Sequence, residues 1–407
     1  MKSTISALLV LALCVFASST QAAPQSKPIL ENVFTLELKF GDKDVPDEFL
    51  LVRPVVGIGI ALNGDIIVSD ESKLKVFDTS GKPKKIVGRK GQGPGEFERD
   101  PLPIIIENGN ICAIDIGRYR YNLFSSNYSL IETKNLQNDP LFNKYAQEKG
   151  WGTLFYNFVY PYSREEIYIY TQASDLGRTG EERKNYNVIL YQNGEKITTI
   201  VESPQEQSIL IKNIMPISLP RGVLIQKLMP EKKVVYSETH KDKVFENGKW
   251  FYIIYEYNLS TVQRRILIKR EYTPVAIPDS IIHPEKKSGY NGDTVVAMAR
   301  TSEGVVNVTQ KEYDQKKTEL LKELKVYPGI QFLFYDGNLL FVQTYNYEKN
   351  KGWLVDIFNS TTGTYLRSAY FPFIPIIKDG YAYRIVRSAD EFPYIEKYKI
   401  DPAIYGK

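Results

Sequence analysis

The chain has 407 residues, of which 52 are Lys or Arg, 48 are Asp or Glu, and 43% are hydrophobic. This nearly balanced charge argues against nucleic acid or an anionic membrane surface as a partner, because both require concentrated positive charge. No apolar run reaches the roughly 20 residues of a membrane-spanning helix, so we expect no transmembrane segment.

Residues 1–22 have the features of a secretory signal peptide. Lys2 supplies a short basic region, residues 5–17 form an apolar run, and small side chains stand before the end of the segment at Ala22. We expect cleavage after Ala22 and export to the periplasm or the extracellular space.

The two cysteines predict no internal disulfide. Cys14 would leave with the signal peptide, and lipid attachment there is disfavoured by the bulky Leu13 before it and the apolar sequence after it. Cys112 then remains alone in an apolar, strand-like stretch. The stability of the exported chain must therefore come from its core.

Most of the remaining chain predicts β-strands. Apolar and polar residues alternate in runs rich in Ile, Val, Tyr and Phe, and Asn-Gly, Asp-Gly or Ser-Gly pairs bound these runs. The clearest runs are residues 33–40, 64–70, 73–78, 165–172, 250–258, 264–272 and 338–345. The sequence thus predicts an all-β protein.

Part of the strand pattern repeats. Residues 57–97 contain four strand-like runs with three short connections, and residues 103–136 form a weaker copy. In this copy, Asn108-Gly109, Asp115 and Phe124 stand where Asn63-Gly64, Asp70 and Phe77 stood. Later copies cover residues 330–371 and 375–400, and the last contains only three strands.

One segment, residues 308–325, predicts a helix inserted between sheets. Its apolar residues Tyr313, Leu320, Leu321 and Leu324 fall near helical spacing. Thr309 precedes Glu312 by three residues, which is the arrangement of a capping box.

The first repeat resembles an NHL repeat, whose pattern has a "DGDIYVTD" strand, a "RIQVFD" strand and a "GxxGxGPGEF" exit. The corresponding segments here are "NGDIIVSD", "KLKVFD" and "GRKGQGPGEF". Asp115 and Arg120 keep the family's interval of five residues between Asp and Arg, whereas Lys73 replaces that arginine in the first repeat. The whole chain is similar to exported bacterial six-bladed propellers of the NHL-like, TolB-like kind, and residues 140–330 depart most from the pattern.

Physical reasoning supports a closed ring. A row of small sheets would end in exposed strand edges, and radial repetition removes them. The last repeat lacks a fourth strand, so we expect residues 33–40 to pair with it. The prediction is one six-bladed β-propeller domain over residues 33–407, with four-stranded antiparallel sheets near 55–97, 101–136, 155–201, 214–275, 329–371 and 373–400.

The glycine-rich stretch at residues 88–97 predicts a turn between two blades. It lacks the Lys-Ser/Thr pair and the following helix of a phosphate-binding loop. The resemblance implies that ligands bind on this face, onto which residues 116–122 should also open. Our candidate ligand-binding residues, suited to carboxylates or sugar rings, are Arg89, Lys90, Arg118, Tyr119 and Arg120. The alternative is that these are solvated loop residues, with one arginine bracing its neighbour.

No catalytic or metal-binding motif is evident. His240 and His283 lie in polar, turn-like sequence without the spacing of a zinc site. Asp70 and Asp115 could contribute to a calcium site, but at strand ends we expect them to cap backbone amides. The pairs Glu165-Glu166 and Glu181-Glu182 look like surface loops.

We therefore expect a monomeric, non-catalytic binding propeller without a cofactor, whose ligand is a protein, a peptide or a glycan. The alternative is a calcium-dependent lactonase or lyase built on the same ring. A third hypothesis is a component of an envelope complex that docks through the helix at 308–325.

Overall fold

The computed structural model describes residues 28–43, 45–54, 57–175, 184–205, 208–212, 214–219, 223–282, 291–301 and 304–407. The predicted signal peptide, His283 and the pair Glu181-Glu182 lie outside the described residues.

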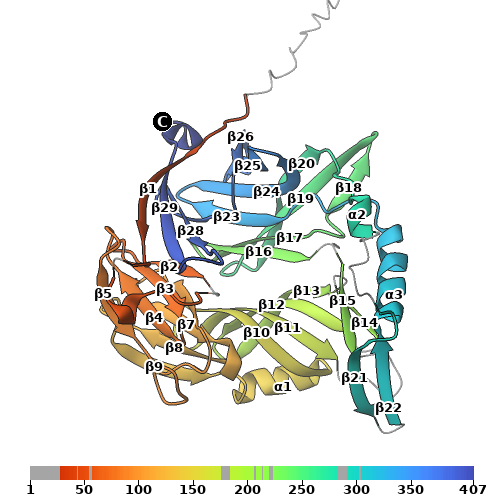
Figure 1. The fold of residues 1–407 in the computed structure, drawn as a ribbon, viewed down its shortest axis with the longest axis horizontal. Helices are drawn as coiled ribbons and strands as arrows, with labels where there is room; N and C mark the ends of the chain where they lie inside the picture. The colour runs from red at the N-terminus through yellow and green to blue at the C-terminus, as the bar shows by residue number, and fades with distance from the viewer. Residues whose placement is uncertain are drawn as a thin grey trace, which may run out of the picture.

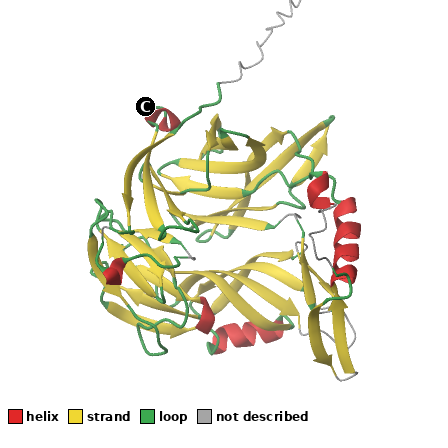
Figure 2. Ribbon diagram, in the orientation of Figure 1, coloured by secondary structure: helices red, strands yellow, loops and turns green. Residues whose placement is uncertain are grey.

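Six antiparallel β-sheets form a ring, seen face-on in Figure 1 and coloured by secondary structure in Figure 2. Blades 1 and 2 consist of β2 (Ile58–Ile60), β3 (Ile66–Asp70), β4 (Lys73–Phe77) and β5 (Pro83–Val87), then β6 (Leu102–Ile105), β7 (Ile111–Asp115), β8 (Arg120–Phe124) and β9 (Leu130–Asn135). Blades 3 and 4 consist of β10 (Trp151–Pro161), β11 (Glu166–Asp175), β12 (Asn185–Asn193) and β13 (Lys196–Pro204), then β16 (Leu224–Met229), β17 (Lys233–Glu238), β18 (Lys243–Glu246), β19 (Lys249–Asn258) and β20 (Gln263–Tyr272). Blade 5 consists of β23 (Phe332–Asp336), β24 (Leu339–Glu348), β25 (Gly352–Asn359) and β26 (Tyr365–Phe371).

Blade 6 confirms the predicted closure of the ring. It contains β27 (Ile376–Lys378), β28 (Tyr381–Val386) and β29 (Tyr394–Ile400). Strand β1 (Phe34–Phe40), from the other end of the chain, completes it by pairing antiparallel with β29. The register places Phe34 opposite Ile400 and Phe40 opposite Ile395. This pairing satisfies backbone groups that an open edge would expose.

Neighbouring blades contact each other through apolar faces. The first strands of adjacent blades lie side by side, as with β2 and β6 or β16 and β23, which makes them the inner strands of the ring. Between blades 6 and 1, for example, the rings of Phe40 and Phe49 pack on Phe77 with centroids 5.0 and 5.8 Å apart. Each such fully buried side chain contributes about 1.5–3 kcal/mol relative to exposure.

The inserted segments are more extensive than the sequence predicted. The expected helix is α3 (Gln310–Glu323), and the capping box of Thr309 and Glu312 is formed. The structure adds α1 (Pro140–Glu148), the short α2 (Asp279–Ile282) and the 3-10 helices η1 (Asp47–Phe49), η2 (Ile116–Arg118) and η3 (Pro402–Tyr405). It also adds two hairpins, made by β14 (Ser208–Ile211) with β15 (Met215–Ser218) and by β21 (Val295–Thr301) with β22 (Gly304–Thr309).

One predicted boundary is wrong. The predicted fourth sheet, residues 214–275, includes residues 215–218, but these residues pair with β14, and blade 4 begins at Leu224. The reason is packing, because Ile217 and Leu219 lie against Leu320 and Leu321 of α3 rather than against the blade. None of the helices in the described part of the chain has the length and apolar character to cross a membrane.

Candidate functional site

We use the word connector for a segment that joins the outer strand of one blade to the inner strand of the next. Two aspartates at the ends of second strands hold connectors in place. Buried Asp70 accepts hydrogen bonds of 2.8 Å from the backbone amides of both Val52 and Arg53. Buried Asp115 accepts one of 3.0 Å from the amide of Glu98. The predicted role of both residues, capping of backbone amides, is therefore confirmed.

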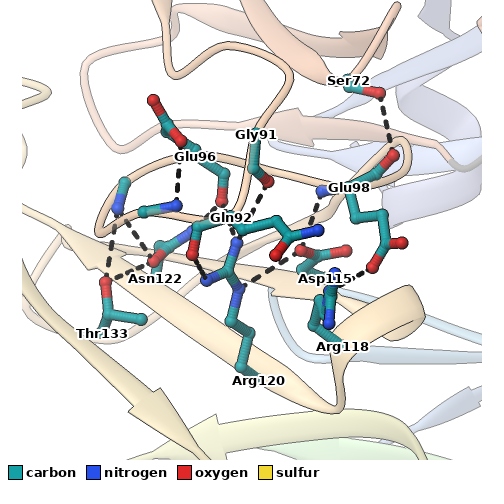
Figure 3. Close-up of polar contacts among 12 residues, drawn as sticks. Ser72, Gly91, Gln92, Glu96, Glu98, Asp115, Arg118, Arg120, Asn122 and Thr133 are labelled. Carbon is teal, nitrogen blue, oxygen red and sulfur yellow. Dashed lines mark hydrogen bonds and ion pairs between the residues drawn. The ribbon is translucent and has the colours of Figure 1, made fainter.

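Arg120 braces the connector between blades 1 and 2 (Figure 3). Its guanidinium donates to the carbonyl oxygens of Gln92 and Glu96, each at 2.7 Å, and its Nε lies 3.3 Å from Asp115 Oδ2. The residue is only 7% exposed. The guanidinium of Arg120 donates its hydrogen bonds to groups of this chain. Arg120 therefore supports the loop at residues 88–97 instead of facing a ligand.

In blade 1, a lysine that the sequence analysis missed pairs with the buried aspartate, as Arg120 does in blade 2. The register places Lys73 opposite Asp70, but the partly exposed Lys73 pairs with Glu71. The ammonium that reaches Asp70, at 2.8 Å, belongs to the fully buried Lys75. Lys75 follows Asp70 by five residues, the interval that separates Asp115 from Arg120. This interval, and the position of a lysine inside an apolar strand, could have indicated from the sequence that Lys75 pairs with Asp70.

The other charged candidates are also paired or lie on the surface. Arg89 Nε lies 2.7 Å from Glu96 Oε1 while the side chain stays 82% exposed, and Arg118 forms an ion pair with Glu98. The hydrogen bond from the Gly93 amide and the adjacent Arg89 guanidinium lower the pKa of Glu96.

The stretch at residues 88–97 is a turn, as predicted. The Phe97 amide donates to the Arg89 carbonyl at 2.9 Å, and the exposed Lys90 forms a parallel bridge with Phe97. The next regular element is strand β6, so no helix follows that could bind a phosphate at its N-terminus.

Tyr119 differs from the four basic candidates because it lines a pocket. Its backbone is left-handed, with φ of 50°, and ends η2. Its ring lies 6.0 Å from that of Phe155 and 6.5 Å from that of Tyr156. The pocket has a volume of about 270 Å³. Its lining residues are Tyr119, Gln137, Asn143, Ala146, Gln147, Trp151, Gly152, Leu154 and Tyr156.

Helix α1 forms one wall of this pocket, within the connector between blades 2 and 3. Asp139 caps its first turn by accepting hydrogen bonds from the amides of Leu141 and Phe142 at 3.0 and 3.4 Å. Pro140 follows in the first turn, where a backbone N–H would have no partner within the helix, so its missing N–H costs nothing. Phe142 is buried on one side of the helix, whereas Asn143 and Gln147, one turn apart, are exposed. The pair Asp139-Pro140 was a usable signal for this helix.

The floor of the pocket is held by the fold around it. The Leu136 amide donates to the Tyr119 carbonyl at 2.9 Å, and the Tyr156 hydroxyl donates to the Leu136 carbonyl at 3.4 Å. Trp151 and Tyr156 are almost fully buried at the start of β10. Burial raises the pKa of the Tyr156 hydroxyl, so this group stays protonated near neutral pH.

Among the residues that the structure describes, no charged side chain lines the pocket. A nearby cation, Lys149, lies 3.5 Å from Glu202 and 5.7 Å from the centre of the Trp151 ring. The pocket therefore offers a ligand the half-buried ring of Tyr119 and neutral amides, with Trp151 and Tyr156 almost fully buried behind them.

The residues described by the structure contain no group of three or more His, Cys, Asp or Glu side chains that could hold a metal ion. Cys112 is buried, and burial raises the pKa of its thiol. The alternative of calcium-dependent chemistry stays a prediction, and we identify no site for the ion among the described residues.

Comparison with known proteins agrees with the architecture. Residues 46–237 match a family model, DUF5128, described as a 6-bladed beta-propeller. This match and the six observed sheets show that the chain is a six-bladed β-propeller. The finer resemblance to NHL repeats stays a prediction. No curated protein matches the sequence.

Several solved structures are similar over most of the chain. A Bacteroides fragilis protein described as a candidate for export is 13% identical, with 92% of this chain and 97% of that chain covered and a TM-score of 0.43. A member of the DUF4221 family from Bacteroides vulgatus is 12% identical, with 90% and 98% covered and a TM-score of 0.43. An inactive virginiamycin B lyase from Staphylococcus aureus, solved with quinupristin, is 9% identical, with 90% and 99% covered and a TM-score of 0.39.

Proposed function

We propose that this protein is an exported β-propeller that binds a protein, peptide or glycan ligand without transforming it, in the pocket between Tyr119 and α1. The observation that carries this proposal is the lining of the pocket, which combines aromatic rings with neutral amides and, in the described part of the chain, contains no charged side chain. Pockets of this composition, concave and largely pre-formed, are typical of binding sites.

The same lining supports binding rather than catalysis. General acid–base catalysis needs a group whose pKa lies near the working pH. The titratable groups of the lining are the hydroxyls of Tyr119 and Tyr156, and the pKa of Tyr156 is raised further by burial. Export is supported by the signal-peptide features of residues 1–22.

The five candidate residues take different parts in this proposal. Tyr119 contacts the ligand, and Arg120 and Arg118 are positioning residues that tie the loop bearing Tyr119 to the connector between blades 1 and 2. Arg89 and Lys90 are exposed on the other connector, and we assign them no contact with the ligand in the pocket.

The test is a binding and turnover assay on the chain from residue 23 onward. Purified protein is titrated by calorimetry with a panel of neutral glycans, acidic glycans and short peptides, and each probe is afterwards checked for conversion by mass spectrometry. We expect at least one probe to bind and to be recovered unchanged. Tyr119→Asn, which suits left-handed backbone but removes the ring, should weaken binding about tenfold or more.

Tyr347→Ala is the matched control, because Tyr347 is 57% exposed on blade 5 and distant in sequence from the pocket. Equal affinity of wild type and Tyr119→Asn, or conversion of the bound probe, would contradict the proposal. Export is tested separately by the N-terminal mass of protein recovered from the medium or periplasm, which should begin at residue 23.

A further inference from the structure

Three primary amides line the pocket, beside the hydroxyls of Tyr119 and Tyr156. Asn143 and Gln147 project from consecutive turns of α1, and Gln137 belongs to the connector just before the helix. All three residues are exposed, and within the described ranges their side-chain amides form no hydrogen bond. Each amide carries two donors and an acceptor on neighbouring atoms. Adjacent hydroxyl groups, each a donor and an acceptor at once, are the natural complement of such groups.

The apolar part of the lining consists of three aromatic side chains together with Ala146 and Leu154. Tyr119 is half-buried at the wall, with Tyr156 and Trp151 almost fully buried beside it. Aromatic rings pack well against flat apolar faces, while their polar tips and the neighbouring amides contact polar groups. A ligand that matches this wall has one apolar face and a rim of hydrogen-bonding groups.

The described lining residues carry no charge and the volume of the pocket is small, and both observations narrow the ligand class. A carboxylate or phosphate would lose its hydration without meeting an opposite charge, which is costly. The volume of about 270 Å³ lies below the roughly 300–1,000 Å³ of pockets for drug-sized ligands. There is room for one ring-sized unit rather than for a folded segment of a protein.

We propose that the pocket binds a single neutral sugar ring, as a free sugar or as one residue of a glycan. This inference rests on the proposed binding function and specifies its ligand. The apolar face of the ring packs on Tyr119, and its hydroxyl groups exchange hydrogen bonds with Asn143, Gln147 and Gln137. An amide side chain of a peptide would satisfy one of these groups, but it lacks the ring-sized apolar face.

The experiment follows Trp fluorescence, with Trp151 in the pocket as reporter. The probes are the methyl glycosides of glucose, galactose, mannose and N-acetylglucosamine, with glucuronate and N-acetylglutamine amide as the contrasting probes. We expect a saturable change with at least one neutral glycoside and none with glucuronate. The double variant Asn143→Ala, Gln147→Ala should bind that glycoside more weakly by about tenfold or more, since two lost hydrogen bonds of about 1 kcal/mol each together weaken binding by more than tenfold.

The matched control is the double variant Lys144→Ala, Glu148→Ala. These residues form an exposed ion pair on the same helix, and neither lines the pocket. Both double variants place alanine, the best helix former, at exposed helical positions, so both should fold. The control should bind the glycoside within twofold of wild type.

The outcomes separate this inference from the function on which it rests. Binding of the peptide amide alone, lost in Tyr119→Asn, would overturn the sugar assignment and keep the binding function. Preference for glucuronate, or equal affinity of Asn143→Ala, Gln147→Ala and wild type for the glycoside, would also overturn the sugar assignment. Failure of every probe, including the wider peptide and glycan panel, would remove both proposals.

Discussion

Two connectors occupy equivalent positions in the ring but have opposite chemistry. The one after blade 1, residues 88–101, is rich in glycine and is held by the buried Arg120 and by a pair between Arg89 and Glu96. The one after blade 2, residues 136–150, contains the capped helix α1 and presents exposed neutral amides. Hydrogen bonds join the loop at 116–120 to both, so all three lie on one face.

The difference shows that charge on this face holds the chain together. Arg120 gives its hydrogen bonds to connector carbonyls and to Asp115, and Arg118 is paired with Glu98. The surface suited to a ligand lies at the second connector, where the lining is neutral. Two residues that are adjacent in the sequence therefore have different roles. Tyr119 is half-buried and lines the pocket, whereas Arg120 is buried and holds the first connector.

Removal of Arg120 should have the largest effect. Arg120→Ala leaves Asp115 buried without a cation and removes the guanidinium donor of the Gln92 and Glu96 carbonyls, so we expect a loss of about 3–5 kcal/mol in the free energy of unfolding. Urea denaturation followed by circular dichroism measures it.

Arg118→Ala serves as the control, because its ion pair is half-exposed and should contribute about 1 kcal/mol or less. Equal stability of Arg120→Ala and wild type would show that glycine turns alone hold the first connector.

Glycine substitutions provide the second test. Both Gly88 and Gly150 have left-handed backbone, with φ of 72° and 73°. A Cβ at Gly88 would lie 2.4 Å from the Phe97 ring, whereas one at Gly150 would meet nothing within 4 Å. Gly88→Ala should thus cost about 3 kcal/mol, from strain and overpacking, and Gly150→Ala about 1 kcal/mol, from strain alone. Equal losses in thermal or urea denaturation would contradict the tighter packing of the first connector.

The repeated local signals explain why the fold could be predicted. Turn pairs such as Asn63-Gly64 and strand ends such as Asp70 recur at similar spacing, and the unpaired run at 33–40 matched the missing strand of the last repeat. The inserted segments could not be placed, because an alternating run such as 215–218 indicates a strand without indicating its partner.

The candidate site was predictable only in part, for a related reason. The sequence places one basic-aromatic group at Arg118, Tyr119 and Arg120. However, η2 ends at Arg118 and β8 begins at Arg120, so the three side chains lie in different surroundings. The amides Asn143 and Gln147 had no motif at all. They become a candidate site only because α1 packs beside a segment 24 residues or more away along the chain, at Tyr119.

The cap of α1 tests whether the second connector depends on its helix. Asp139→Ala removes the acceptor for two amides and should cost about 1 kcal/mol in unfolding free energy. It should also weaken binding of any pocket ligand, because Asn143 and Gln147 stand on this helix. Asp139→Asn keeps the cap and removes only the 3.5 Å ion pair with Lys134, so it should stay close to wild type in both measurements.

The smallest expected effect concerns the pH response of the first connector. The pKa of Glu96 is lowered from its ordinary value of 4.5, first by the Gly93 amide and then by Arg89. A lowered pKa means that the folded chain prefers the ionised form. Glu96 therefore stabilises the protein fully above pH 4.5, and this contribution is lost as the pH falls through the lowered value.

Glu96→Gln keeps an acceptor for the Gly93 amide and removes the charge. Wild type should be slightly more stable than Glu96→Gln at pH 7, and the difference should vanish in strong acid or shrink in 1 M salt, which screens an exposed pair. Thermal denaturation of both proteins across this pH range provides the measurement. If the difference in stability between the two proteins changed with neither pH nor salt, the charge on Glu96 would have no part in holding the connector. The hydrogen bond from the Gly93 amide would then be sufficient.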